Sequence, residues 1–365
     1  MIFFVLNLPK PRRSRIAQTS SQRQLVTDRK AFKFFLVLTA CISFCRWMSA
    51  QSQAKNPDFS LKIPVELVVV PVTVEDKDGN LVDSLQKDDF EVREEGILQN
   101  LNYFSADPFP LSVAILLDRS TDSRTQSTVH ETLLPLIESF SSFDEMALFQ
   151  FENTTDKLQD FTFDKDQTLK AFKNISLKGS PPPVSGGPFT GEPNINGVPV
   201  ETGTGRVSQP KTLNVHIDDA IFAACQELRR RGKERRKVII IISNGQNAPG
   251  NRNSYESTME SVLSSDIVIY GIAQGSALLS RKLNTLTKYA GATGGAVFYP
   301  VRTSAFSDSY QKITQMARNQ YVLGYVPQNE VHKVTFRRIS VKVKNVEVKG
   351  ANVRSRKGYY AIPRF

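Results

Sequence analysis

The stretch LSVAILLDRSTDS, Leu111 to Ser123, decides the fold expected for this chain. Leu111 to Asp118 is a continuous apolar run, which is typical of a strand covered on both faces of a parallel sheet. The run KVIIIISNG, Lys237 to Gly245, repeats this pattern and ends in polar residues in the same way. Each run therefore predicts a central strand followed by a polar loop.

Strand-like and helix-like patterns alternate through residues 109–319, which we take as one α/β domain. Further strands are expected at Glu145–Asn153, Ile267–Ala273 and Ala296–Val301. Helices are expected at Val129–Ser141, Gln167–Ile175, His216–Gly232, Ser254–Asp266, Arg281–Gly295 and Ser304–Asn319. Gly232 is placed to end the third of these helices. This alternation predicts a doubly wound, mostly parallel sheet.

The regions on either side of the α/β domain have β-type patterns without a helical period. Residues 63–108 predict a small β unit, with strands at Val65–Glu75 and Leu98–Phe104. Residues 320–365 predict a second β segment, and the two segments are expected to fold together beside the α/β domain. Residues 179–210 are rich in Gly and Pro, which predicts a surface insertion without a packed element.

Positive charge is concentrated at the start of the chain. Residues 1–50 hold eight of the eleven net positive charges, so the body is nearly balanced, which argues against a nucleic-acid partner. Lys30 and Lys33 precede the apolar run Phe34–Cys45, and small residues follow it, which predicts a signal peptide over 1–50 and a linker over 51–62. The protein is therefore expected to be exported, to the periplasm, the cell envelope or the medium.

Two alternatives for this leader remain open: lipidation at Cys41, in a lipobox-like LTAC, or an uncleaved anchor. Either one would give the protein its only contact with a membrane. If the leader is removed, Cys225 is the one remaining cysteine, so no intramolecular disulfide forms.

Polar side chains follow the two central strands. They are expected at the carboxyl edge of the parallel sheet, which is where such sheets bind ligands. They are Asp118, Ser120 and Asp122 after the first strand, and Ser243, Asn244 and Gln246 after the second. Their oxygens suit a hard divalent cation such as Mg²⁺, Mn²⁺ or Ca²⁺. In the alternative interpretation, Asp118 and Ser120 cap the next helix by accepting backbone N–H bonds.

The chain resembles von Willebrand factor A-type domains, and in particular the bacterial VWFA-related proteins described from Acidobacteria. Four blocks between Val65 and Ala361 carry the resemblance: VVVPVTVEDKDGNLVDSLQKDDFEVREEG, PLSVAILLDRSTDS, DDAIFAACQEL with KVIIIISNGQN, and YVLGYVP with RKGYYA. The resemblance implies an α/β fold with a metal-ion-dependent adhesion site, at which an acidic group of a partner completes the metal shell.

That site has a D-x-S-x-S loop, a threonine before the middle helix and an aspartate after the central strand. This chain keeps Asp118 and Ser120, and has Asp122 at the last serine position. The threonine position falls near Val215, with Thr212 and Asn214 close by but out of register, and Asn244 replaces the late aspartate. The resemblance thus implies a degenerate site, with metal ligands Asp118, Ser120 and Asp122 and with Asn244 as a second-shell residue.

Other chemistry-bearing features favour ordinary structural roles. The basic run Arg229–Lys237 could bind acidic lipids or polymers, but the favoured interpretation is a helix C-terminus, stabilised by the macrodipole, with a solvated loop. Asp218 and Asp219 are adjacent on a helix, so their side chains diverge. His130, His216 and His332 lie on different elements without metal-ligand spacing, and no hydrolase or nucleotide motif is present.

These observations lead to an exported, non-enzymatic von Willebrand A-like module that binds a protein or a cell-envelope component. No cofactor is expected with certainty beyond a weakly bound divalent cation. Two alternatives remain: a structural envelope protein without metal or specific ligand, and a hydrolase with an unrecognised site.

Overall fold

The computed structural model describes residues 67–121, 123–175, 194–195, 198–199, 215–278, 284–328, 332–344 and 350–363. All of them belong to one structural unit, Val65–Phe365. The predicted signal peptide and linker, 1–62, fall in the other unit, Met1–Pro64, and lie outside the described residues. In the described part of the chain, no helix is both long enough and apolar enough to cross a membrane.

A six-stranded sheet forms the centre of the α/β domain, in the order β12-β11-β10-β5-β6-β7. The strands are β5 (Leu111–Asp118), β6 (Glu145–Phe151), β7 (Thr155–Thr162), β10 (Arg236–Ser243), β11 (Ile267–Ala273) and β12 (Val297–Phe298). Neighbouring strands are parallel except for β6 and β7, which run antiparallel. This confirms the predicted doubly wound, mostly parallel sheet.

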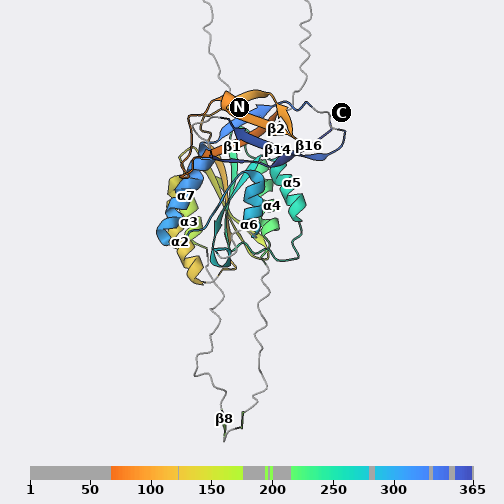
Figure 1. Ribbon diagram of the computed structural model, residues 1–365. Coiled ribbons are helices and arrows are strands. Elements are labelled where there is room, and N and C mark those ends of the chain that lie inside the picture. The colour runs from red at the N-terminus through yellow and green to blue at the C-terminus, as the bar shows by residue number, and fades with distance from the viewer. Residues whose placement is uncertain are drawn as a thin grey trace, which may run out of the picture. The chain divides into compact units, whose positions relative to one another are not determined.

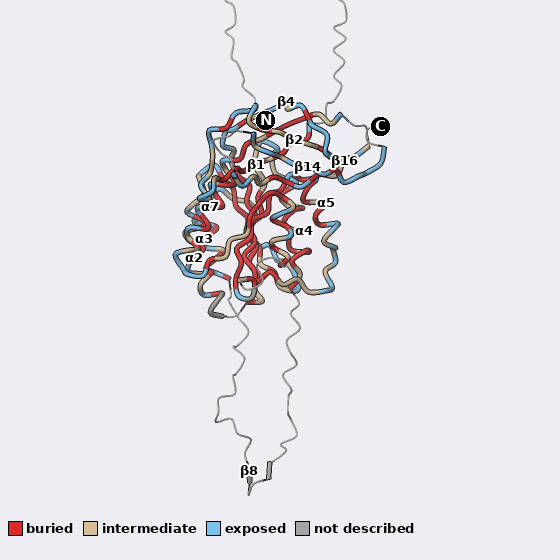
Figure 2. The backbone as a smooth tube through the Cα atoms, in the orientation of Figure 1, coloured by how far each residue is buried: buried red, intermediate tan, exposed pale blue. Residues whose placement is uncertain are grey.

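Helices cover both faces of this sheet, as Figure 1 shows. One face packs against α2 (Ser123–Ser139), α3 (Lys165–Lys173) and α7 (Thr303–Arg318). The other packs against α4 (Ile217–Arg229), α5 (Tyr255–Ser264) and α6 (Thr285–Thr293), with the short 3-10 turn η2 (Gly275–Leu278) nearby. Strand alternation divides β10 between two apolar cores: Val238, Ile240 and Ile242 face α2 and α7, and Ile239 and Ile241 face α4 to α6. Figure 2 shows the resulting buried centre.

Two four-stranded antiparallel sheets lie at one end of the α/β domain and form the β unit (Figure 1). The first has the order β15-β1-β13-β4, from Asn352–Ser355, Val68–Glu75, Tyr321–Tyr325 and Leu101–Ser105. The second has the order β16-β14-β2-β3, from Gly358–Ala361, Thr335–Val343, Phe90–Glu94 and Ile97–Gln99, and the turn η1 (Lys87–Asp89) leads into β2. Each sheet therefore combines strands from the two ends of the described chain, around a third apolar core.

Several local features differ from the sequence expectations. The strand expected at Leu98–Phe104 is two strands, β3 and β4, which belong to different sheets. Helix α4 ends at Arg229 rather than at Gly232, because the N–H groups of Arg230 and Arg231 close the last turn on the carbonyls of Glu227 and Leu228. Helix α2 begins at Ser123, before the expected start, and keeps Pro135 in its interior.

Within residues 179–210, the structure describes only β8 (Asn194–Ile195) and β9 (Val198–Pro199). These strands pair with each other in an antiparallel ladder. The described structure of the predicted insertion is therefore this one short ladder.

The buried carboxylate of Asp144 joins the first residue of β5 to the end of α7, and this contact is sensitive to acid. Asp144 is fully buried and accepts bonds from the N–H groups of Leu111 (2.9 Å) and Ser141 (2.7 Å) and from the Arg318 guanidinium (2.5 Å). Burial by itself raises the pKa of Asp144, but the bonds from Arg318, Leu111 and Ser141 outweigh it and leave the pKa below its ordinary value.

A carboxyl with a lowered native pKa stabilises the fold above its unfolded pKa, about 3.9, and loses that contribution as the pH falls through its native pKa. Asp144→Asn is therefore expected to lower the free energy of unfolding at neutral pH by about 1–3 kcal/mol and to flatten the loss of stability on acidification. Urea unfolding between neutral pH and pH of about 3 measures both effects. Asp88→Asn, at an exposed aspartate, serves as the control. An equal acid dependence in the Asp144 variant and the wild type contradicts the assignment.

Candidate functional site

The order of the strands identifies one point on the sheet where a ligand site is favoured. The chain leaves β5 through α2 to reach β6 on one side, whereas β10 lies on the other side of β5. The strand order therefore reverses between β5 and β10, and open α/β sheets bind ligands at the carboxyl ends of the strands at such a switch point. Asp118 ends β5 and Ser243 ends β10.

Asp118 joins the loops that follow these two strands. Its Oδ1 accepts bonds from the N–H of Ser120 (2.8 Å) and the hydroxyl of Ser120 (2.6 Å). Its Oδ2 accepts bonds from the hydroxyl of Ser243 (2.6 Å) and the N–H of Asn244 (3.3 Å). The described contacts of Asp118 thus lie within its own loop and with the loop after β10.

Asn244 completes the cluster from the other side. Its Nδ2 donates to the hydroxyl of Ser120 (3.2 Å), and its Oδ1 accepts the N–H of Gln246 (2.8 Å). The structure therefore brings together Asp118, Ser120 and Asn244, which the sequence placed on separate loops. Asp122, the remaining predicted ligand, lies outside the described residues.

Two further residues shape the site, of which only Ser243 was expected at this edge of the sheet. The hydroxyl of Ser243 holds Asp118 and also accepts the N–H of Gly245 (3.0 Å). Gln126 on α2 is buried, and its Nε2 donates to the carbonyls of Arg119 (2.9 Å) and Thr121 (2.7 Å), which fixes the path of the β5–α2 loop. The position of Ser243 at a strand end was a usable signal, whereas no sequence pattern distinguishes Gln126.

The electrostatics of the cluster are unusual for a carboxylate. Burial raises the pKa of Asp118, and the bonds from Ser120, Ser243 and Asn244 offset this only in part. Among the described residues, no Lys, Arg or His forms an ion pair with Asp118. A buried carboxylate in this situation favours either a proton or a cation.

The remaining positions of the implied metal site do not supply ligands among the described residues. Val215, near the expected threonine, is fully buried in the apolar core under α4, and its carbonyl accepts the N–H of Ala248 (2.8 Å). Thr212 and Asn214 lie outside the described residues. No group of three or more Asp, Glu, His or Cys side chains suited to a metal occurs where side chains are described. The described donors, one carboxylate and neighbouring hydroxyls, therefore form an incomplete cation site by themselves.

The two carboxylates at the start of α4 have structural partners of their own. Asp218 accepts bonds from the hydroxyl of Tyr289 (2.7 Å) and the amide of Asn247 (2.8 Å). Asp219 accepts the N–H groups of Arg252 (2.9 Å) and Asn253 (2.8 Å). The adjacent side chains thus point to different partners, and both hold the long loop between β10 and α5 in place.

Comparison with known proteins gives similarity of fold only. No protein-family model matches the chain, and no curated protein matches it. Solved structures do match. Among them are von Willebrand factor type A domains.

One such match is a von Willebrand factor type A protein from Catenulispora acidiphila, with a TM-score of 0.42, 10% identity, and coverage of 76% of this chain and 75% of that one. An aerotolerance-related membrane protein from Bacteroides fragilis has a TM-score of 0.39, 14% identity, and coverage of 56% and 98%. Proximal thread matrix protein 1 from the mussel byssus, solved with a zinc-occupied MIDAS motif, has a TM-score of 0.36, 14% identity, and coverage of 59% and 49%. The match therefore spans about half of the mussel protein.

Proposed function

We propose that this chain is an exported von Willebrand A-like module, of the bacterial VWFA-related type, that binds a protein or a cell-envelope component and catalyses no reaction. The observation that carries the proposal is the cluster of Asp118, Ser120, Ser243 and Asn244 at the switch point of the sheet. A buried carboxylate held between two loops, without an ion-pair partner among the described residues, is a natural contact for a cation or for a donor group of a partner.

The proposal includes a weak and conditional role for a divalent cation. Asp118 and Ser120 would hold the ion, together with Asp122 if its carboxylate follows the resemblance, and Asn244 would orient the hydroxyl of Ser120. Mg²⁺ favours sites with one or two carboxylates and near-octahedral oxygen ligands. Asn244 stands where the complete site has an aspartate, and its neutral amide donates to Ser120. The affinity for the cation is therefore expected to be lower than at a complete site.

The hydrolase alternative receives less support from this geometry. Ser120 and Ser243, the two hydroxyls at the cluster, both donate to Asp118. A serine nucleophile needs a neighbouring general base that accepts its proton and that a third group orients. The imidazole of His216, at the start of α4, has its described polar contact with Asp219 (3.9 Å) and not with either serine.

The variant Asp118→Asn tests the proposal, because it removes the charge and keeps the shape of the side chain. In EDTA, the variant should melt somewhat below the wild type, because the amide nitrogen that replaces one oxygen cannot accept the N–H of Ser120 or of Asn244. Excess Mg²⁺, Mn²⁺ or Ca²⁺ should raise the melting temperature of the wild type but not that of Asp118→Asn. An ion at about 100 times its Kd contributes about 2.7 kcal/mol. Asp88→Asn is the matched control and should respond to cations as the wild type does.

Partner binding is read from the same variants of the full-length chain. Wild type and Asp88→Asn should capture the same proteins or polymers from envelope extracts, and Asp118→Asn should capture less. Equal capture by all three would place the binding surface elsewhere. No cation response together with reduced capture would leave a partner site that works without metal.

A further inference from the structure

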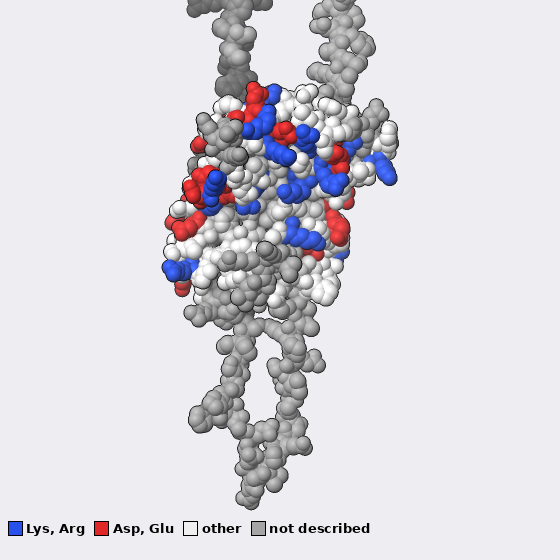
Figure 3. Space-filling view, in the orientation of Figure 1, with Lys and Arg blue, Asp and Glu red and all other residues white. Residues whose placement is uncertain are grey.

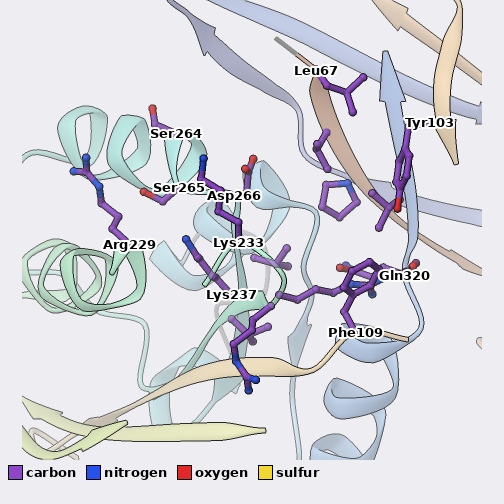
Figure 4. Close-up of a pocket in the computed structure, with 17 residues that line it drawn as sticks. Leu67, Tyr103, Phe109, Arg229, Lys233, Lys237, Ser264, Ser265, Asp266 and Gln320 are labelled. Carbon is purple, nitrogen blue, oxygen red and sulfur yellow. Dashed lines mark hydrogen bonds between the residues drawn. The ribbon is translucent and has the colours of Figure 1, made fainter. Parts of the chain in front are cut away.

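A cavity of about 640 Å³ lies near the opposite edge of the parallel sheet from Asp118, beside the first residues of β10 and β11. Its second wall is the outer face of the sheet that contains β1, β13 and β4. Figure 4 shows Arg229, Lys233 and Lys237 on one side of this cavity and Leu67, Tyr103 and Phe109 on the other. The volume is in the range of small-molecule sites, about 300–1,000 Å³.

The apolar wall consists of side chains that the β unit turns away from its own core. Val70 on β1 is fully buried between the two sheets, and strand alternation directs its neighbours Val69 and Pro71 toward the cavity. Leu67 and Tyr103 continue this wall with 36% and 42% of their surfaces exposed. Apolar surface left in contact with water favours an apolar ligand, by about 25 cal/mol for each Å² that the ligand buries.

Most of the basic run Arg229–Lys237 has partners within the protein. Arg230 pairs with Glu227, and both Arg231 and Arg235 pair with Glu145. The guanidinium of Arg236 stacks on Phe109 and donates to four main-chain carbonyls, those of Ala317 (3.0 Å), Arg318 (2.9 Å), Gln320 (2.6 Å) and Asp107 (3.4 Å). The run is therefore more than a solvated helix end, since much of it fastens α4 and β10 to their neighbours.

The side chains of Arg229, Lys233 and Lys237 differ from these, because none of them forms a hydrogen bond or ion pair within the described part of the chain. Lys237 is half-buried, and burial lowers the pKa of its ammonium group. Asp266, the one carboxylate that lines the cavity, is bound by Arg356 at 2.7 Å. On the face seen in Figure 3, Lys and Arg are mixed with Asp and Glu. Among the described residues, three cationic side chains without a hydrogen bond or ion pair therefore lie beside one cavity.

We propose that this cavity binds a single-chain anionic amphiphile, with its acyl chain along Val69, Pro71 and Tyr103 and its anionic head beside Lys237, Arg229 and Lys233. The apolar wall and the cations face each other across one cavity, so a ligand needs both a chain and a negative charge to use the whole site. A membrane surface would satisfy the cations but would leave the apolar wall unfilled.

Calorimetric titration of the full-length chain with dodecanoate and with dodecyl phosphate, below their micelle concentrations, tests this site. At least one of them should bind, and the difference between them tells which head group is preferred. Dodecanol and acetate, which carry only the chain or only the charge, should each bind at least about tenfold more weakly, because a charge-assisted contact contributes about 1.5–3 kcal/mol.

Variants assign the binding to the cavity. Lys237→Gln with Arg229→Gln should weaken dodecanoate or dodecyl phosphate about tenfold or more, whereas Lys237→Arg should keep the affinity. Lys342→Gln removes an exposed lysine on β14 and is the matched control. The proposal is overturned if neither anion binds, if dodecanol binds as tightly as the anions, or if the double variant, shown to be folded by circular dichroism, binds like the control.

Discussion

Replacing Arg337 by methionine is expected to lower the free energy of unfolding by about 3–5 kcal/mol, because it leaves a buried carboxylate without its cation. Arg337 on β14 contacts Glu94 on β2 at 2.7 Å, and the Glu94 side chain is completely buried. The hydroxyls of Tyr325 (2.7 Å) and Tyr359 (3.0 Å) donate to the other oxygen of Glu94. Because Tyr325 belongs to the other sheet, this network joins the two layers of the β unit.

Chemical denaturation of matched variants measures this effect. Arg338→Met changes the next residue, whose ion pair with Glu95 is open to solvent, so only a small change is expected there. Glu94→Met with Arg337→Met removes both charges but leaves the two tyrosine hydroxyls without an acceptor. This double variant should therefore recover only part of the free energy of unfolding that Arg337→Met loses. Adding Tyr325→Phe and Tyr359→Phe should recover more of it. Equal effects of Arg337→Met and Arg338→Met would mean that the buried network does not stabilise the fold.

Truncation at the centre of the sheet should have a similarly large effect. Ile240 lies in the middle of β10, between β5 and β11, and is fully buried. Ile240→Ala should lower the free energy of unfolding by about 2–5 kcal/mol, and Ile240→Val by about 0.5–1.5 kcal/mol, because the close-packed core cannot collapse around the lost volume.

A control for this prediction is Val334→Ala, at a side chain that is 56% exposed and should give almost no change. Urea titration of the three variants gives the comparison. If Ile240→Ala lowers the free energy of unfolding no more than Ile240→Val does, the helices on this face have moved in to fill the cavity. That result would contradict a rigid core.

The fold class was predictable because the strands that define it are apolar on both faces. β5 begins and ends at the residues that the sequence predicted, and β10 and β11 agree closely, since a strand covered by helices on both sides needs an unbroken apolar run. β7 was not predicted, because it is an edge strand and most of its side chains are partly or fully exposed, which leaves no apolar pattern. The division of Leu98–Phe104 between two sheets also has no local signal, because the partners of each half come from distant segments.

The candidate site was predictable in its position but not in its bonding. Parallel strands place their carboxyl ends at one edge, so Asp118 and Asn244 had to be neighbours once β5 and β10 were adjacent. The sequence could not say that the amide of Asn244 would donate to Ser120, or that Ser243 would take one oxygen of Asp118. These contacts depend on side-chain rotations in two loops, which no periodicity encodes.

The interleaving of the β unit has a consequence for the order in which the protein is made. In the first sheet, Val72 on β1 pairs with Tyr321 on one side and with Ser355 on the other. Strand β1 therefore leaves the ribosome long before its partners exist, and this sheet is completed only when β15 has been synthesised. Contacts so distant in sequence form slowly. For the exported protein proposed above, this delay would keep β1 unpaired until β13 and β15 follow it.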